Sequence, residues 1–268
     1  TSWKITAFIS KMGGFVKQTL SEPEALFYAR LDDLFDTAER RCIPKFTSFL
    51  DESQQFLAER YLERTKRSGW MLWGGYEGAV RRMLGAFPDY MEPSLEQFPI
   101  APFTASYRKA DVLTHRDFLG SLMALGIKRE AVGDILPAEG SCLFFTTDRI
   151  QALVLGEVEK IGRTGVRLEP GVHMALPEGA KFQEISGTVA SLRLDCVVAL
   201  LTGKSRERAG ELIQGGLVAK NYQLCDSNSA AVKPGDILSV RGFGKARLAE
   251  EVRMTKKDRC FITLMKYV

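Results

Sequence analysis

Residues suited to metal binding or redox chemistry are scarce in this sequence. It contains two histidines, and its five cysteines are odd in number, scattered and never arranged as Cys-x-x-Cys. We therefore expect no metal site, no cofactor and no disulfide framework. Reduced thiols are typical of a cytoplasmic protein.

Long apolar runs are also missing, and none approaches the roughly 20 residues that span a membrane. The first twenty residues combine Lys4, Lys11 and Lys17 with apolar side chains, and no acid precedes Glu22. We interpret them as a peripheral helix or a partly ordered tail, because two glycines at 13 and 14 interrupt the stretch. A membrane-surface helix or a targeting remnant stays open.

The chain is longer than one typical domain, and its 45% hydrophobic and 26% charged residues indicate ordinary globular cores. Apolar periodicity predicts an α+β protein with a helical N-terminal region at 1–68. Residues 69–170 follow β-α-β-β-α-β order, that of the ferredoxin-like (RRM-like) sandwich which many RNA-recognition modules use. A linker at 171–187 and a compact unit at 188–268 complete the prediction. The expected central elements are strands at 101–107, 132–136, 141–146 and 165–168 and helices at 114–125 and 148–161.

Positive charge is concentrated toward the C-terminus. From residue 186 onward there are 14 Lys and Arg against 8 Asp and Glu, whereas the preceding 185 residues hold 23 against 25. This asymmetry favours a polyanionic partner, although a solvated basic face gives the same pattern.

The most informative charges lie in two predicted helices of the basic tail. Apolar residues at 194, 197, 198 and 201 predict one buried helical stripe. Ser205 is a suitable N-cap for a second helix, which puts Arg206 and Arg208 in its first turn. The helix dipole disfavours cations there by roughly 0.3–1 kcal/mol each. A phosphate would reverse the balance, because free N–H groups and two guanidiniums then converge on it. A solvated helix start is the alternative.

A wider pattern in this tail resembles the S-four-type RNA-binding domain, named after a small-subunit ribosomal protein. The matching segments are Leu192-Arg193-Leu194-Asp195, Ser205-Arg206-x-Arg208-Ala209, Ile213, Gly216, Val218, Asn221, Lys233-Pro234-Gly235-Asp236 and Val240-Arg241-Gly242. The resemblance implies two helices and a small β-sheet that present basic side chains to folded RNA. The RNA-contacting positions that it implies are Arg193, Lys204, Ser205, Arg206, Arg208, Asn221, Lys233 and Arg241.

Motifs across roughly residues 24–250 resemble the YlmH family of bacterial proteins. They are Thr47-x-Phe49-Leu50-Asp51, Gly74-Gly75-Tyr76-Glu77, Phe87-Pro88-Asp89, the stretches 113–120, 126–130 and 133–135, and Val240-Arg241-Gly242-Phe243-Gly244-Lys245. This resemblance implies binding to the large ribosomal subunit and peptidyl-tRNA on stalled or obstructed ribosomes, in translation or ribosome-associated quality control. It also implies a bacterial cytoplasmic protein, from a family often encoded beside cell-division genes. We add Lys245, within the last motif, to the expected RNA contacts.

His115 and Arg116 form a second candidate phosphate site. They follow Thr114, which with Asp117 makes a capping pair for the predicted helix. Both basic side chains lie in the first turn, against the helix dipole. An ordinary exposed pair explains them equally well.

Three functional classes are open on the residues. Phosphate loops, nucleophile elbows and dinucleotide fingerprints are missing from the sequence, so we expect no catalytic residues and no small-molecule substrate. An RNA-modifying enzyme of the pseudouridine synthase type is the first alternative, since a lone catalytic aspartate would escape such a search. A cell-division interaction protein is the second, and its binding would survive high salt, whereas phosphate contacts weaken as salt rises.

We therefore expect a non-catalytic protein that binds rRNA or tRNA by shape, through phosphate contacts. Combining Arg206→Glu with Arg208→Glu is expected to abolish co-sedimentation with ribosomes. Thermal stability is expected to stay unchanged or to rise, because the substitutions remove cations from a helix start.

Overall fold

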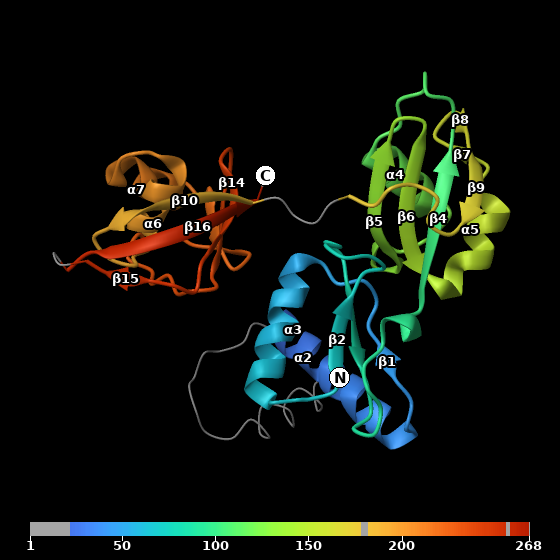
Figure 1. The fold of residues 1–268 in the computed structure, drawn as a ribbon, viewed down its shortest axis with the longest axis horizontal. Coiled ribbons are helices and arrows are strands. Elements are labelled where there is room, and N and C mark those ends of the chain that lie inside the picture. Colours follow the sequence, from blue (N-terminus) through green and yellow to red (C-terminus); the bar gives the residue numbers. More distant parts are fainter. Residues whose placement is uncertain (1–21, 178–181, 256–257, 268) are drawn as a thin grey trace. The chain divides into compact units, whose positions relative to one another are not determined.

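The structure is a computed structural model that describes residues 22–177, 182–255 and 258–267. The helix or tail predicted for the first twenty residues lies outside the described residues. The chain divides into two compact units between residues 177 and 178. Unit 1 runs from blue to yellow and unit 2 from orange to red (Figure 1). Both units combine helices with antiparallel sheets, which confirms the predicted α+β class.

Unit 1 begins with two helices that pack on a small antiparallel sheet. Helix α2 starts with acidic and ends with basic residues, the polarity that the helix dipole favours. Asp51 and Gln54 form a capping box at the start of α3. Buried Tyr28, Tyr61 and Leu84 join the two helices to the sheet. The elements are α2 (Glu22–Arg41), β1 (Lys45–Phe46), α3 (Glu52–Thr65), β2 (Trp70–Trp73) and β3 (Met83–Ala86), with strand order β1-β3-β2.

The rest of unit 1 contains the predicted succession of four strands and two helices. The strands form an antiparallel sheet in the order β5-β6-β4-β9. Phe118 and Leu122 of α4 and Val154 of α5 are buried in its core. The elements are η1 (Leu95–Gln97), β4 (Ile100–Ser106), α4 (His115–Ala124), η2 (Arg129–Ala131), β5 (Val132–Ala138), β6 (Ser141–Thr147), η3 (Asp148–Ile150), α5 (Gln151–Glu157), β7 (Lys160–Ile161), β8 (Thr164–Gly165) and β9 (Arg167–Pro170).

The helix predicted for 148–161 is too long. A 3-10 turn occupies its start, α5 ends at Glu157, and Lys160–Ile161 pairs with Thr164–Gly165 as a small hairpin. Gly162 stands in the turn with φ of 59°, a backbone conformation that suits glycine. The hairpin therefore replaces the last helical turn that the apolar pattern predicted.

The buried carboxylate of Asp134 ties the two parts of unit 1 together. It accepts hydrogen bonds from the Tyr76 hydroxyl at 2.8 Å and from the backbone N–H groups of Val80 at 2.7 Å and Arg81 at 2.9 Å. Gly75, which directly precedes Tyr76, has φ of 101°. A Cβ there would lie 2.5 Å from a ring carbon of Phe145. Gly75 is therefore required both by its conformation and by this close approach.

The described part of unit 2 is a seven-stranded antiparallel sheet with two helices. The strand order is β10-β16-β14-β13-β11-β12, and β15 pairs with β16. The elements are β10 (Phe182–Val189), α6 (Leu194–Thr202), α7 (Arg206–Gln214), β11 (Val218–Lys220), β12 (Gln223–Leu224), β13 (Ile237–Val240), β14 (Gly244–Leu248), β15 (Arg253–Met254) and β16 (Cys260–Tyr267).

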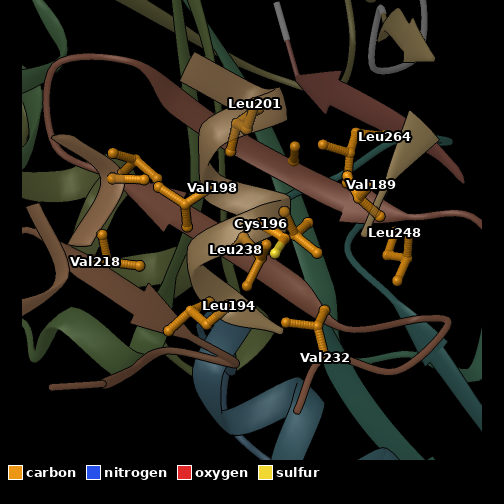
Figure 2. Close-up of a cluster of buried hydrophobic side chains, with 14 of the residues drawn as sticks. Val189, Leu194, Cys196, Val198, Leu201, Val218, Val232, Leu238, Leu248 and Leu264 are labelled. Atoms are coloured by element: carbon orange, nitrogen blue, oxygen red, sulfur yellow. The ribbon is translucent and has the colours of Figure 1, made fainter. Parts of the chain in front are cut away.

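The apolar stripe of α6 forms the centre of the unit 2 core. Leu194, Val198 and Leu201 lie beside sheet residues such as Leu238 and Leu264 (Figure 2). All four members of the predicted stripe are buried, so this part of the prediction is confirmed. The stripe fixes which side of α6 remains available to solvent and to neighbouring polar groups.

The end of the expected linker at 171–187 is strand. Residues 182–189 form β10, which pairs along its whole length with β16, from Phe182 opposite Tyr267 to Val189 opposite Cys260. Glycine at 187 suggested a connection, but its missing side chain makes room for Leu200, whose Cδ1 lies 2.5 Å from where a Cβ would stand. Close packing, rather than flexibility, explains this glycine.

Membrane-spanning helices and metal-ligand clusters are both missing from the residues that the structure describes. No helix among them has the length and apolar character needed to cross a membrane. No three histidine, cysteine or acidic side chains in the same residues gather as metal ligands.

Candidate nucleic-acid interface

The start of α7 has the predicted local geometry. Ser205 is extended, with φ of −61° and ψ of 156°, and its hydroxyl accepts a hydrogen bond from the backbone N–H of Arg208 at 3.2 Å. Arg206 and Arg208 occupy the first turn and remain substantially exposed, with side-chain exposures of 53% and 63%. The N-cap prediction is confirmed, and both guanidiniums can reach solvent.

The buried carboxylate of Asp195, on the neighbouring helix α6, accepts hydrogen bonds from two arginines. Asp195 has only 7% of its side chain exposed. Arg206 Nε donates to its Oδ2 at 2.9 Å, and Arg193 donates from Nε to Oδ1 and from Nη2 to Oδ2, each at 3.2 Å. Burial alone would raise the pKa of the Asp195 carboxyl, but the hydrogen bonds from Arg193 and Arg206 outweigh it and the pKa lies below its ordinary value. This arginine–aspartate cluster joins the starts of α6 and α7.

The cluster corrects the physical premise behind the predicted phosphate site. Arg206 is not an uncompensated cation at a helix start, because Asp195 supplies the acid from another helix, and Arg208 pairs with Glu211 in its own. Substituting Arg206 with Glu would place a second carboxylate beside Asp195. The expectation of unchanged or raised stability in the Arg206→Glu and Arg208→Glu protein is therefore replaced by an expected loss.

The cluster still presents donors outward. Arg206 uses only Nε on Asp195, and its two Nη groups make no hydrogen bond within the described part of the chain. Arg193 has 43% of its side chain exposed. A pair of guanidiniums held in fixed orientation by a shared carboxylate loses little conformational entropy on binding, which favours phosphate contact.

The loop before α7 lies beside the β13–β14 turn. Lys204 Nζ lies 5.6 Å from the ring centroid of Phe243, a cation–π distance. Gly242 and Gly244 flank that ring with φ of 85° and 100°, so the turn depends on glycine. Arg241, within the same turn, is exposed. The fold therefore brings two predicted contacts, 204 and 241, to neighbouring segments.

Lys245 makes a separate contact on β14. Its Nζ lies 4.4 Å from the ring centroid of Tyr267 on β16, and the side chain is half-buried. Packing over an aromatic ring fixes its position but leaves its charge in place.

The Asn221 side chain has a structural role. Its φ is 51°, its Nδ2 donates to Asp236 Oδ1 at 2.7 Å, and its Oδ1 accepts from the backbone N–H of Ile237 at 2.8 Å. Asp236 also accepts from the backbone N–H of Lys233 at 2.8 Å. The amide thus orients the turn that carries the exposed Lys233 side chain.

His115 and Arg116 lie in unit 1, at the exposed start of α4. The capping pair is as predicted: Thr114 donates to Asp117 Oδ2 from its hydroxyl at 2.6 Å and from its backbone N–H at 2.7 Å. These hydrogen bonds lower the pKa of the Asp117 carboxyl. Asp117 therefore stabilises the start of α4. The His115 and Arg116 side chains beside it are exposed to solvent.

Sequence reasoning missed Asp195 as the organising residue. No local signal set it apart, because an acid in the first turn of a helix is what the dipole favours in general, and the burial of Asp195 is a feature of the tertiary structure. Its partner Arg206 lies 11 residues away, beyond any local pattern.

Comparison with known proteins places this chain. Residues 93–174 match the family model described as "Putative RNA-binding domain in YlmH". The chain is 34% identical over 221 residues to the "Ribosome-associated protein quality control protein P2" of Bacillus subtilis (strain 168), covering 82% of this chain and 86% of that protein. It also resembles the solved "Cell division protein ylmH from Streptococcus pneumoniae", with a TM-score of 0.51 and 21% identity over 59% of this chain and 96% of the other, a likeness of fold alone. The sequence match over most of both chains shows that this protein is a member of the YlmH family.

Proposed function

We propose that this chain is a non-catalytic, cytoplasmic RNA-binding protein that acts at the ribosome. In this proposal it holds structured rRNA or tRNA through phosphates, on the large subunit with peptidyl-tRNA. The name of the Bacillus relative supports the ribosomal setting, and the description of the matched family supports RNA as the ligand. The charge excess after residue 186 supports a polyanion.

The observation that carries the proposal is the grouping of exposed cations at the start of α7 and the β13–β14 turn. Arg193 and Arg206 keep their orientation through Asp195, while Lys204 and Arg241 lie on neighbouring segments. Arg208, Lys233 and Lys245 extend the proposed contact surface in unit 2, with Ser205 and Asn221 positioning it. His115 and Arg116 are proposed as a contact of unit 1.

The architecture is consistent with this assignment. We propose that the central four-stranded sheet of unit 1, with order β5-β6-β4-β9, is a ferredoxin-like domain. We likewise propose that α6, α7 and the sheet of unit 2 form an S-four-type module. In domain terms, this keeps 188–268 as the RNA module, which β10 extends back to 182. The predicted boundary between 1–68 and 69–170 moves past β3, because β2 and β3 share a sheet with β1.

The test uses Lys204 and Arg241, which form no ion pair with any residue that the structure describes. Combining Lys204→Glu with Arg241→Glu should reduce co-sedimentation with ribosomes at least tenfold, because about two phosphate contacts become repulsive. The matched control, Arg247→Glu with Arg253→Glu, changes the net charge equally but at side chains that face exposed acids. Thermal melting should be alike in both proteins.

Three results would contradict the proposal. One is wild-type pelleting of the Lys204 and Arg241 protein. Another is equal loss in the control, which would indicate a bulk charge effect. The third is pelleting that survives nuclease and high salt, which would favour a protein partner.

A further inference from the structure

Two arginines of unit 1 donate hydrogen bonds to the same backbone carbonyl oxygen. Arg81 Nε donates to the Val132 carbonyl at 3.0 Å, and Arg129 Nη1 donates to the same oxygen at 2.6 Å. Arg81 Nη2 also donates to the Phe49 carbonyl at 2.9 Å, and Arg129 Nη1 lies 3.3 Å from the Gly133 carbonyl. Two like charges are thus fixed side by side by main-chain groups.

No carboxylate neutralises this arginine pair directly. Over the residues that the structure describes, neither guanidinium forms an ion pair within 4.0 Å. Burial lowers the pKa of Arg81 and of Arg129, and for Arg129 the neighbouring charge of Arg81 lowers it further. Asp51 and Asp134 act on both only at longer range. An anion that reached the pair would relieve this repulsion.

The arginine pair lines a cavity of about 500 Å³. Arg30 from α2 and Lys128 from the loop before η2 add two exposed cations to the same wall. The acids that line it are Asp51 and Glu130, and Asp51 is already engaged in capping α3 through a 2.8 Å hydrogen bond from the Gln54 backbone. Cations therefore outnumber acids here, four to two.

A second cavity of about 540 Å³ adjoins the first. The two share four lining residues, and the second adds two cations and one acid. The shared residues are Thr47, Ser48, Lys128 and Glu130, and the additions are Lys45, Arg149 and Asp148. The two cavities adjoin at these shared residues, and we refer to them together as the basic groove.

We propose that this basic groove binds phosphate-bearing nucleotides, as a single-stranded segment of RNA. Guanidinium forks match phosphate oxygens in pairs, and each cavity lies in the size range of small-ligand sites. Cations repeated along adjoining cavities suit a polymer with one charge per residue better than a single acidic group. The ligand class rests on the proposed function, but the site is separate from the unit 2 arginines and includes Arg30 and Arg81, which lie outside the matched family region.

The test removes charge from the groove without touching its framework. Arg30→Gln with Lys128→Gln leaves the Arg81 and Arg129 hydrogen bonds intact. The matched control, Arg41→Gln with Lys66→Gln, neutralises two exposed cations of unit 1 that do not line the groove. Both are made in the full chain carrying Lys204→Glu and Arg241→Glu, so that unit 2 contributes little RNA binding.

Binding of a short labelled oligouridine is measured by fluorescence anisotropy over a range of salt concentrations. The groove variant should bind about tenfold more weakly at low salt, and its salt slope should fall by about 1.4, or about 0.7 for each lost contact with a single strand. The control should match its parent. Displacement of the probe by uridine monophosphate at similar concentrations would identify a free nucleotide as the source of the phosphate, and its failure would identify the RNA strand.

Several results would overturn the inference. They are an unchanged slope in the groove variant, an equal change in the control, no oligouridine binding by the parent, or equally effective displacement by oligoglutamate. Ribosome co-sedimentation of the Lys204 and Arg241 protein tests the proposed function separately. A negative result for the groove would leave the co-sedimentation result unaffected. A negative co-sedimentation result would likewise leave the groove result unaffected.

Discussion

Two pairs of arginines, one in each unit, resolve their mutual repulsion in different ways. In unit 2, Arg193 and Arg206 share the buried carboxylate of Asp195. In unit 1, Arg81 and Arg129 share only the carbonyl of Val132. A carboxylate carries a full charge and a carbonyl only a dipole. One carboxylate therefore offsets one of the two charges of the first pair, whereas Asp51 and Asp134 act on the second pair only at longer range.

The difference separates two uses of arginine. Guanidiniums that bond a shared carboxylate stabilise the junction of two helices and offer their remaining N–H groups as oriented donors. Guanidiniums in a cavity that bond no carboxylate directly contribute less to folding, but they gain more when an anion arrives. Stability measurements should distinguish these two uses, because removing a charge from the unit 2 pair should destabilise its unit more than removing one from the unit 1 pair.

The largest expected effect is in the unit 2 cluster. Asp195→Ala should lower the free energy of unfolding of unit 2 by about 2 kcal/mol, less than for a fully buried pair because both guanidiniums reach solvent. Hydrogen exchange of the α6 amides under urea measures this loss. Exchange at the wild-type rate would mean that Asp195 does not organise the cluster.

Neutralising one arginine of each pair sharpens the comparison. Arg206→Gln should speed hydrogen exchange in α6, because buried Asp195 loses its closest charged donor. Arg129→Gln should leave the unfolding free energy of unit 1 within about 1 kcal/mol of wild type, because lost hydrogen bonds and relieved repulsion oppose each other. Fluorescence of Trp70 and Trp73 in β2 reports on unit 1 during unfolding. Equal destabilisation of both units would break the distinction.

The smallest effect is a pH dependence that Asp195 contributes to the stability of unit 2. The pKa of Asp195 is lower in the fold than the ordinary aspartate value of 3.8. Its ion pairs therefore add stability above that value, and this contribution is lost as the pH falls through the folded pKa. Comparing wild type with Asp195→Asn by acid titration of α6 exchange isolates the contribution. An identical acid dependence in the two proteins would contradict it.

Local features of the fold were predictable where one element contained all the needed information. The α6 stripe, the Ser205 N-cap and the Thr114–Asp117 capping pair each depend on residues three or four positions apart. Prediction failed where a segment pairs with a distant one. Strand β10 forms because β16 lies opposite it, and its own composition resembles that of a connection. The end of the helix predicted after 148 was wrong for a local reason, since residues 160–165 form a hairpin around Gly162.

The candidate site shows the same division. The sequence alone determined that the C-terminal third is basic, that Arg206 and Arg208 stand at a helix start, and that the motifs resemble the YlmH family. Only the tertiary structure decided which carboxylate meets which guanidinium. Arg206 finds Asp195 across 11 positions, and Arg81 finds the Val132 carbonyl across 51. Electrostatic energy depends on distance and burial, and packing between elements sets both.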